Sequence, residues 1–586
     1  MRLHIGGRSG LVAGLALCQP HVAAASDPTQ KTILGSSNPL DESFGVYVKE
    51  LLDKWHVPGV AIAVVDGDDI WAEGYGIATF PSTPVTPSTL FYTGSTTKAF
   101  VAGALSLMID SGNYTLPALP PTGPPSPYRH ASLQLPSPEH DYAPRKLDWT
   151  TPISAVLGDD FVLQDAWATA HLTLQDALSH RTGMPRHDGA ISRRYGDGDG
   201  APAATVRDIT RSLRHLPLSA EPREKFMYCN LMYAVLSHCV ETLAGGRWLG
   251  DLLREWIWAP LGMRSTFFSL EDALAAEREA PGAVHLAGGY YWDNATAGFA
   301  RAPFIGVREV SGAGGILSNV EDYARWVKCH LDGGRPVFSE EGIAAVRKPQ
   351  MPVDSDGPVL FDTPQSYASG WFTSSYRGHR FWTHSGGMHA YGAEVYMFPD
   401  DKFGVVALGN TAMTSNAAEE AAIWRLIDEK LKIPETERID WTKRWETLIG
   451  KKDIVIDGAL DEMFPDRKEP GLPHDLPLES YAGTYFHPGY MNLTIQVVES
   501  EANDKPGKTL YAERPDATWM MTYDFQHVSS EYWMVYLGLI YERSGNMRLY
   551  APAQFKIGPS GKVTGLEIGY RSDGALEGNI LFTKID

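Results

Sequence analysis

The chain has 586 residues, of which 43% are hydrophobic and 21% charged. This balance is typical of globular proteins and excludes wholesale disorder. The formal net charge is −20 at pH 7, and an acidic surplus disfavours nucleic-acid binding, which needs clustered Lys and Arg, and docking on anionic membranes. We therefore expect a soluble enzyme or a binding protein with no nucleic-acid partner and no membrane partner.

The N-terminus has the pattern of a secretory signal peptide. Arg2 and Arg8 precede the apolar run 11–18, and three small residues follow at 23–25. This pattern predicts a signal peptide over residues 1–25 and a protein of the secretory pathway. The alternative is a disordered N-terminal tail on a cytoplasmic protein.

The chain has four cysteines, at positions 18, 229, 239 and 329, which are too few for a disulfide scaffold. It contains neither CxxC nor HExxH, so we expect no metal and no cofactor.

The first part of the chain predicts a helix and a β-hairpin. Apolar residues recur on one side of Asp41–Trp55, as in an amphipathic helix. The runs Val60–Val65 and Ile70–Tyr75 flank an Asp-Gly turn, which is typical of a hairpin. The proline-rich stretch Pro117–Pro144 is interpreted as a surface insertion, with an interdomain linker as the alternative.

Further helices and a second hairpin follow. Helices are expected over Thr173–His180 and Leu231–Ala244, and from a capping box at Ser318–Glu321 through Cys329. The expected hairpin, Gly392–Phe398 with Phe403–Leu408, precedes a helix over Asn416–Leu431. Strands near both ends with helices between them predict one α+β domain whose sheet combines distant segments.

The C-terminal part has a different pattern. Residues Trp441–Leu478 are charged and contain proline, as in a linker with some helix. Short alternating runs follow, and they predict a small antiparallel β-barrel or sandwich: Leu493–Val498, Trp533–Tyr541, Met547–Tyr550 and Lys562–Tyr570.

The strongest chemical signal is Gly94-Ser95-Thr96-Thr97-Lys98 before the helical run Ala99–Ile109. A serine at a helix N-terminus with a lysine three residues later places both side chains on one helical face. A neutral amine there could accept the serine proton, and the helix N-terminus could stabilise an oxyanion. Taken alone, the motif also fits an ordinary N-capping serine.

Two further motifs carry suitable groups. Tyr228 and Asn230 are two residues apart before an apolar helix. A tyrosine beside a cation could act as a base, and an asparagine could bind a substrate carbonyl or hold Lys98. The third motif is His384-Ser385-Gly386-Gly387, where glycines on an edge strand would let a substrate approach and the Gly387 N–H could join that of Ser95 around an oxyanion. In isolation, both motifs also have structural interpretations.

In this order, Ser-x-x-Lys, Tyr-x-Asn and His-x-Gly resemble the serine β-lactamase and penicillin-binding protein superfamily, most of all its class C, D-aminopeptidase and esterase branch. Segments 58–65, 178–185, 314–318 and 404–410 also fit, so the resemblance covers about residues 41–433. It implies a β-lactamase/transpeptidase-like antiparallel sheet, flanked by helices, with an inserted helical region.

The resemblance also implies the domain organisation. The catalytic domain is expected over residues 39–435, a linker over 436–478, and a C-terminal β domain over 479–586 that is similar to a lipocalin-like domain. The last is interpreted as a packing or lid domain, with binding of a small apolar ligand as the alternative.

Two departures from the family pattern bear on the substrate. His384-Ser385-Gly386 stands where β-lactamases usually carry Lys-Thr-Gly, which weakens recognition of a β-lactam carboxylate and is typical of esterase, amidase and peptidase relatives. No Glu-bearing loop of the class A type is recognisable, which leaves Tyr228 as the expected base for deacylation.

The implied function is a serine hydrolase that acts on an ester or amide of a small-molecule or peptide-like substrate through an acyl-enzyme on Ser95. The implied catalytic residues are Ser95, Lys98 and Tyr228, and the substrate-binding residues are Asn230, His384, Gly386 and Gly387. The alternatives are an acyltransferase with a natural-product acceptor and a non-catalytic binding protein. The oligomeric state stays open.

Overall fold

The computed structural model describes residues 37–116, 145–194, 202–354, 360–499, 507–542, 548–572 and 575–586. The signal peptide predicted over 1–25 and the insertion predicted over Pro117–Pro144 lie outside these ranges. Residues Pro39–Asp586 pack as one compact unit.

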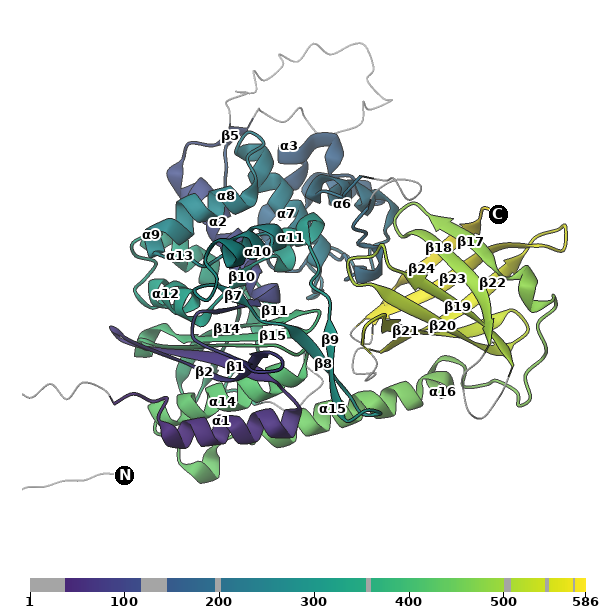
Figure 1. Ribbon diagram of the computed structural model, residues 1–586. Coiled ribbons are helices and arrows are strands. Elements are labelled where there is room, and N and C mark those ends of the chain that lie inside the picture. The colour runs from purple at the N-terminus through teal and green to yellow at the C-terminus, as the bar shows by residue number, and fades with distance from the viewer. Residues whose placement is uncertain are drawn as a thin grey trace, which may run out of the picture. The chain divides into compact units, whose positions relative to one another are not determined.

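A nine-stranded sheet organises the first two thirds of the chain (Figure 1). The strand order is β11-β12-β13-β14-β15-β16-β1-β2-β3, with neighbouring strands antiparallel. Their bounds are β1 Gly59–Asp66, β2 Asp69–Thr79, β3 Thr83–Pro84, β11 Met351–Pro352, β12 Ser366–Tyr367, β13 Phe372–Tyr376, β14 His379–Met388, β15 Tyr391–Phe398 and β16 Phe403–Gly409. Because β1 pairs with β16, the sheet combines distant segments, as predicted.

Alternating side chains of β1 enter two different cores. Val60, Ile62 and Val64 pack with helices α1 (Glu42–Trp55) and α14 (Thr414–Lys430). Alternate residues of the strand belong to the larger core on the other face. Both faces of the central strands are therefore covered, which explains why their sequences are continuous apolar runs.

The helical region inserted between β4 (Thr89–Tyr92) and β11 confirms the predicted α+β, β-lactamase/transpeptidase-like fold. Its helices are α2 Thr97–Ser111, α3 Ile153–Leu157, α4 Ala166–His171, α5 Leu174–Leu178, α6 Val206–Ser212, α7 Asn230–Leu243, α8 Leu249–Leu253, α9 Ala259–Leu261, α10 Leu270–Glu279, α11 Ser311–Gly314, α12 Val320–Leu331 and α13 Glu340–Arg347. Among the described residues, six short strands also lie there: β5 Thr115–Leu116, β6 Arg145–Lys146, β7 His285–Leu286, β8 Gly289–Asp293, β9 Gly298–Ala302 and β10 Leu317–Ser318. Over the described ranges, no helix is both long and apolar enough to cross a membrane.

The predicted start of α12 is wrong by one residue. The N-cap is Asn319, whose side chain accepts the Asp322 N–H at 2.8 Å, so the box expected to begin at Ser318 does not form. Ser318 instead belongs to a short strand, β10 (Leu317–Ser318), that pairs with β4. The pairing of Ser318 with β4 thus explains why Asn319, and not Ser318, caps α12.

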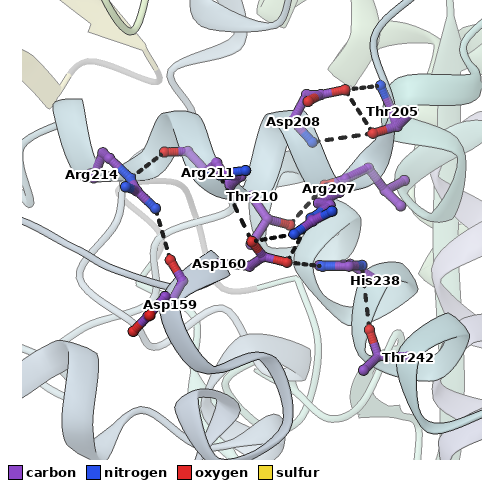
Figure 2. Close-up of polar contacts among 11 residues, drawn as sticks. Asp159, Asp160, Thr205, Arg207, Asp208, Thr210, Arg211, Arg214, His238 and Thr242 are labelled. Carbon is purple, nitrogen blue, oxygen red and sulfur yellow. Dashed lines mark hydrogen bonds and ion pairs between the residues drawn. The ribbon is translucent and has the colours of Figure 1, made fainter.

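A charged cluster joins the short helices of the inserted region (Figure 2). Asp160 accepts hydrogen bonds from Arg207 of α6 at 2.8 Å and from His238 of α7 at 3.1 Å. Burial raises the pKa of Asp160, but these hydrogen bonds outweigh it and hold the pKa below its usual value. The Asp160 carboxylate therefore links α6 to α7, and α7 begins at Asn230.

The C-terminal strands form a closed antiparallel barrel, which resolves the prediction of a barrel or a sandwich (Figure 1). Its strands are β17 Gly483–His487, β18 Met491–Glu499, β19 Lys508–Arg514, β20 Met521–Ser529, β21 Tyr532–Leu539, β22 Leu549–Ile557, β23 Val563–Ser572 and β24 Ala575–Lys584. The predicted linker contains helices α15 (Trp441–Asp457) and α16 (Ala459–Met463). Trp441 stacks on Trp424 of α14 with ring centroids 4.9 Å apart. This contact holds α15 against the part of the chain that contains the nine-stranded sheet and its helices, which we call the sheet domain.

Candidate active site

Ser95 lies in a 3₁₀ turn, Gly94–Thr96, that leads directly into α2. Gly94 has a φ of +53°, and a Cβ on it would lie 2.8 Å from the Gly387 nitrogen. A Cβ on Gly386 would collide with the Thr93 carbonyl oxygen. These positions need glycine because the turn that carries Ser95 packs closely against β14.

Lys98 lies fully buried, one helical turn after Ser95, with its Nζ 3.0 Å from Ser95 Oγ. Nζ also donates to Asn230 Oδ1 at 2.9 Å and to the Ala313 carbonyl at 2.8 Å. Burial, reinforced by the charge of Arg186, lowers the pKa of Lys98 well below its usual value. A neutral amine has two N–H groups, which these two acceptors use, so its lone pair is left for the Ser95 hydroxyl.

Asn230 is held on both sides of its amide. Its Oδ1 accepts from Lys98, and its Nδ2 donates to Asp188 Oδ1 at 2.9 Å. Asp188 in turn receives a hydrogen bond from Arg186 Nε at 2.8 Å. Of the two roles considered for Asn230, this geometry favours holding Lys98 over binding a substrate carbonyl.

The ring of Tyr228 lies near two basic side chains. Lys98 Nζ is 4.7 Å from the centroid of its ring, and the Arg186 guanidinium carbon is 5.1 Å from it. The centroid of the His180 ring lies 4.2 Å from that of the Tyr228 ring, and His180 Nδ1 accepts the backbone N–H of Cys229 at 3.0 Å. The backbone around Tyr228 is thus fixed, and its ring lies close to the Lys98 amine and the Arg186 guanidinium.

His384 is buried and both ring nitrogens are engaged. Nδ1–H donates to the Ser385 carbonyl at 2.6 Å, so Nε2 accepts from the Tyr367 hydroxyl at 2.9 Å. Burial, reinforced by Lys98, lowers the pKa of His384 to about 3, which leaves the ring neutral near pH 7. Its ring centroid lies 6.3 Å from that of Tyr228.

The sequence suggested that the strand carrying the glycines, β14, lies at an edge of the sheet. The structure shows this for only part of β14. β14 pairs with β13 up to the Phe372–Thr383 pair, and beyond it only with β15. Among the strands that the structure describes, none therefore pairs with the second side of Ser385–Gly387. The edge character is restricted to the part of the strand nearest Ser95.

A cavity of about 610 Å³ brings most of the predicted residues together: Ser95, Tyr228, Asn230, His384 and Gly387 line it. Lys98 lies behind Ser95, and Gly386 lines an adjoining cavity of about 660 Å³ that shares Ser385 and Gly387 with the first.

Several residues of the site were not singled out by sequence reasoning. Arg186 and Asp188 follow immediately on the family-like segment 178–185, so their position was a usable signal. Tyr367 had no local signal, because only the sheet brings it to His384. Barrel residues also line the cavity, which no short motif could indicate.

The chain is similar to known proteins over most of its length. The Beta-lactamase family matches residues 46–429, and a domain of unknown function, DUF3471, matches residues 467–580. A protein named unguisins hydrolase ungD′, from Aspergillus campestris, is 40% identical over 527 residues, which cover 90% of this chain and 89% of the relative. Unguisins hydrolase ungD from Aspergillus violaceofuscus is 35% identical over 91% of this chain and 88% of its own length.

A solved structure supports the fold. The octameric penicillin-binding protein homologue from Pyrococcus abyssi superposes with a TM-score of 0.54 at 19% identity, over 92% of this chain and 99% of that one. At this identity the likeness concerns the fold alone. The matched family and the extent of the relatives show that the chain belongs to the β-lactamase family, as its motifs predicted.

Proposed function

We propose that the protein is a serine hydrolase that cleaves an amide or ester bond through an acyl-enzyme on Ser95. The observation that carries the proposal is the position of a buried Lys98 amine 3.0 Å from Ser95 Oγ. Its other two hydrogen bonds go to groups that only accept, Asn230 Oδ1 and the Ala313 carbonyl. A neutral Lys98 is thus oriented to accept the Ser95 proton.

The proposed reaction has two steps. Ser95 Oγ attacks the carbonyl carbon while its proton passes to Lys98, and the oxyanion is held by the N–H groups of Ser95 and Gly387. The C–N or C–O bond then breaks, and the leaving group takes a proton from Lys98 or Tyr228. Water, deprotonated by the same pair, attacks the ester, releases the acid and restores Ser95.

The other predicted residues support these steps. Asn230 orients Lys98 through the contact at 2.9 Å and is itself held by Asp188. His384, neutral and bound to Tyr367, fixes the strand that presents Gly387. A neutral residue at this position fits an uncharged acyl group better than a carboxylate.

The substrate class is inferred from the relatives. Two proteins named unguisins hydrolases match about nine tenths of this chain at 40% and 35% identity, which supports an unguisin or a closely related compound as the substrate. The cavity of about 610 Å³ lies within the range of about 300–1,000 Å³ usual for ligand pockets and leaves room for a molecule of more than one residue.

Incubation of the purified protein with unguisins tests the substrate. We expect hydrolysis, with product masses that together exceed the substrate by one water molecule in liquid chromatography–mass spectrometry. A product that instead carries an added acceptor would favour acyl transfer. Intact unguisin in the presence of a protein that hydrolyses p-nitrophenyl acetate would contradict the proposed substrate, and binding without any turnover would favour the non-catalytic alternative.

A further inference from the structure

The cavity that contains Ser95 is lined in part by the C-terminal barrel. Side chains from β20, β21 and the segment before β20 contribute apolar surface to it: Trp519, Met521, Leu537 and Leu539. We call these four residues the barrel wall. Since they line the same cavity as Ser95 and Tyr228, a substrate large enough to fill this cavity contacts both the catalytic residues and the barrel wall.

Contacts beside Trp519 fix this part of the barrel on the sheet domain. The Thr518 N–H donates to the Ile191 carbonyl at 2.9 Å, and the Arg193 N–H donates to the Asp516 carbonyl at 2.9 Å. The Thr518 hydroxyl also donates to Glu309, which precedes the cavity residue Val310. Trp519 is therefore held next to the apolar part of the sheet domain that lines the cavity.

A second attachment reaches the residues that support Lys98. The His187 N–H donates to Glu577 Oε1 of β24 at 3.0 Å, and His187 Nδ1 lies 2.8 Å from the Tyr490 hydroxyl. Ser219 Oγ donates to the Glu577 carbonyl at 2.8 Å. His187 lies between Arg186 and Asp188, the pair that holds Asn230, so the barrel is anchored on the frame of the catalytic residues.

The chemistry of the barrel wall suits an apolar ligand. Its four side chains carry no charge, and Val307 and Val310 of the sheet domain line the same cavity. Trp519 and Met521 are half-buried, so they retain surface that a ligand could cover. Covering apolar surface stabilises a complex by about 25 cal/mol per Å², and discrimination in such pockets depends on the size of the apolar group.

We propose that the barrel wall determines the specificity of the Ser95 site by binding the apolar side chain or alkyl part of a peptide-like substrate. The proposal rests on the proposed hydrolase function and deepens it. It also gives a role to the region matched by the domain of unknown function: the barrel forms part of the substrate site and is more than a packing domain. Its ligand contacts lie where these residues line the cavity that the barrel shares with the sheet domain.

Four esters test the proposal because they lengthen the acyl chain and the alcohol chain separately. p-Nitrophenyl acetate is compared with p-nitrophenyl octanoate, and ethyl acetate with octyl acetate. In Trp519→Ala and Met521→Gln, we expect kcat/KM to fall about tenfold or more for at least one of the two long-chain esters, p-nitrophenyl octanoate and octyl acetate. For both short esters, kcat/KM should stay within about twofold of the wild-type value. The exposed barrel residues Tyr532 and Leu581 supply the matched controls Tyr532→Ala and Leu581→Ala, which should leave all four values unchanged.

Equal losses on short and long esters, or no loss on any, would overturn the specificity role. A wild-type protein that hydrolyses none of the esters would instead count against the proposed function. A binding measurement then still tests the barrel wall: calorimetry with octyl acetate, which such a protein leaves intact, should show about fivefold or more weaker binding to Met521→Gln than to wild type. Equal affinities would refute the proposal, and thermal melting checks that each variant is folded.

Discussion

Replacement of Ser95 by alanine is expected to lower kcat for p-nitrophenyl acetate on the order of 10⁴-fold or more, because it removes the oxygen to which the proposed mechanism transfers the acyl group. Lys98, Asn230 and Asp188 would remain in place, since their mutual hydrogen bonds do not include the serine. The fold should therefore persist with an unchanged thermal unfolding temperature. Steady-state kinetics and thermal melting give the two readouts.

Ser82→Ala is the matched control because Ser82 is exposed and lies in the same part of the chain. It should retain full activity. If Ser95→Ala kept a substantial fraction of wild-type kcat, another nucleophile or a directly activated water would have to carry the reaction, and the assignment of Ser95 would be wrong.

Replacement of Lys98 by methionine is expected to lower kcat by about 10²–10⁴-fold, because methionine occupies a similar volume but cannot accept the Ser95 proton. The change also leaves Asn230 Oδ1 and the Ala313 carbonyl without their donor, at a cost of about 1–3 kcal/mol for each buried group. We therefore expect a lower melting temperature as well. Lys49→Met, at an exposed position, should change neither quantity.

The pH profile distinguishes a base from a merely structural lysine. A general base acts only when deprotonated, so wild-type kcat/KM should rise with pH through the pKa of Lys98 and then level off. Because burial lowers that pKa well below its usual value, the plateau should begin well below the range in which an exposed lysine titrates. Lys98→Met should lose this limb. A wild-type profile still rising steeply at pH 10 would contradict a neutral Lys98 in the resting enzyme.

The central part of the site could be predicted from the sequence because its geometry is local. Ser95 and Lys98 are three residues apart at the start of a helix, so one helical turn is enough to bring them together. The glycines at 386 and 387 were expected to let a substrate approach, and the structure shows that Gly94 and Gly386 also allow the serine turn to pack closely against β14. Continuous apolar runs likewise predicted the central strands, and short alternating runs predicted the C-terminal barrel or sandwich.

The surroundings of this pair could not be predicted because they depend on tertiary contacts. The link from Arg186 through Asp188 to Asn230 joins a loop to the start of α7, 42 residues apart in the case of Asp188 and Asn230. The barrel wall is further from Ser95 in sequence, and its side chains look like ordinary strand residues until the barrel packs on the sheet domain. Tyr367 shows the same limit, since only strand pairing brings it to His384.

The most direct test of the account is the mass of the peptide that contains Ser95 after the protein is mixed with p-nitrophenyl acetate and quenched in acid. We expect one acetyl group per chain, located on Ser95 by tandem mass spectrometry, and none in Ser95→Ala. The acetyl group should accumulate in wild type within the first turnover and disappear as the substrate is consumed. Acetylation of another residue in a catalytically competent protein, or turnover without any adduct on Ser95 at early times, would contradict the acyl-enzyme.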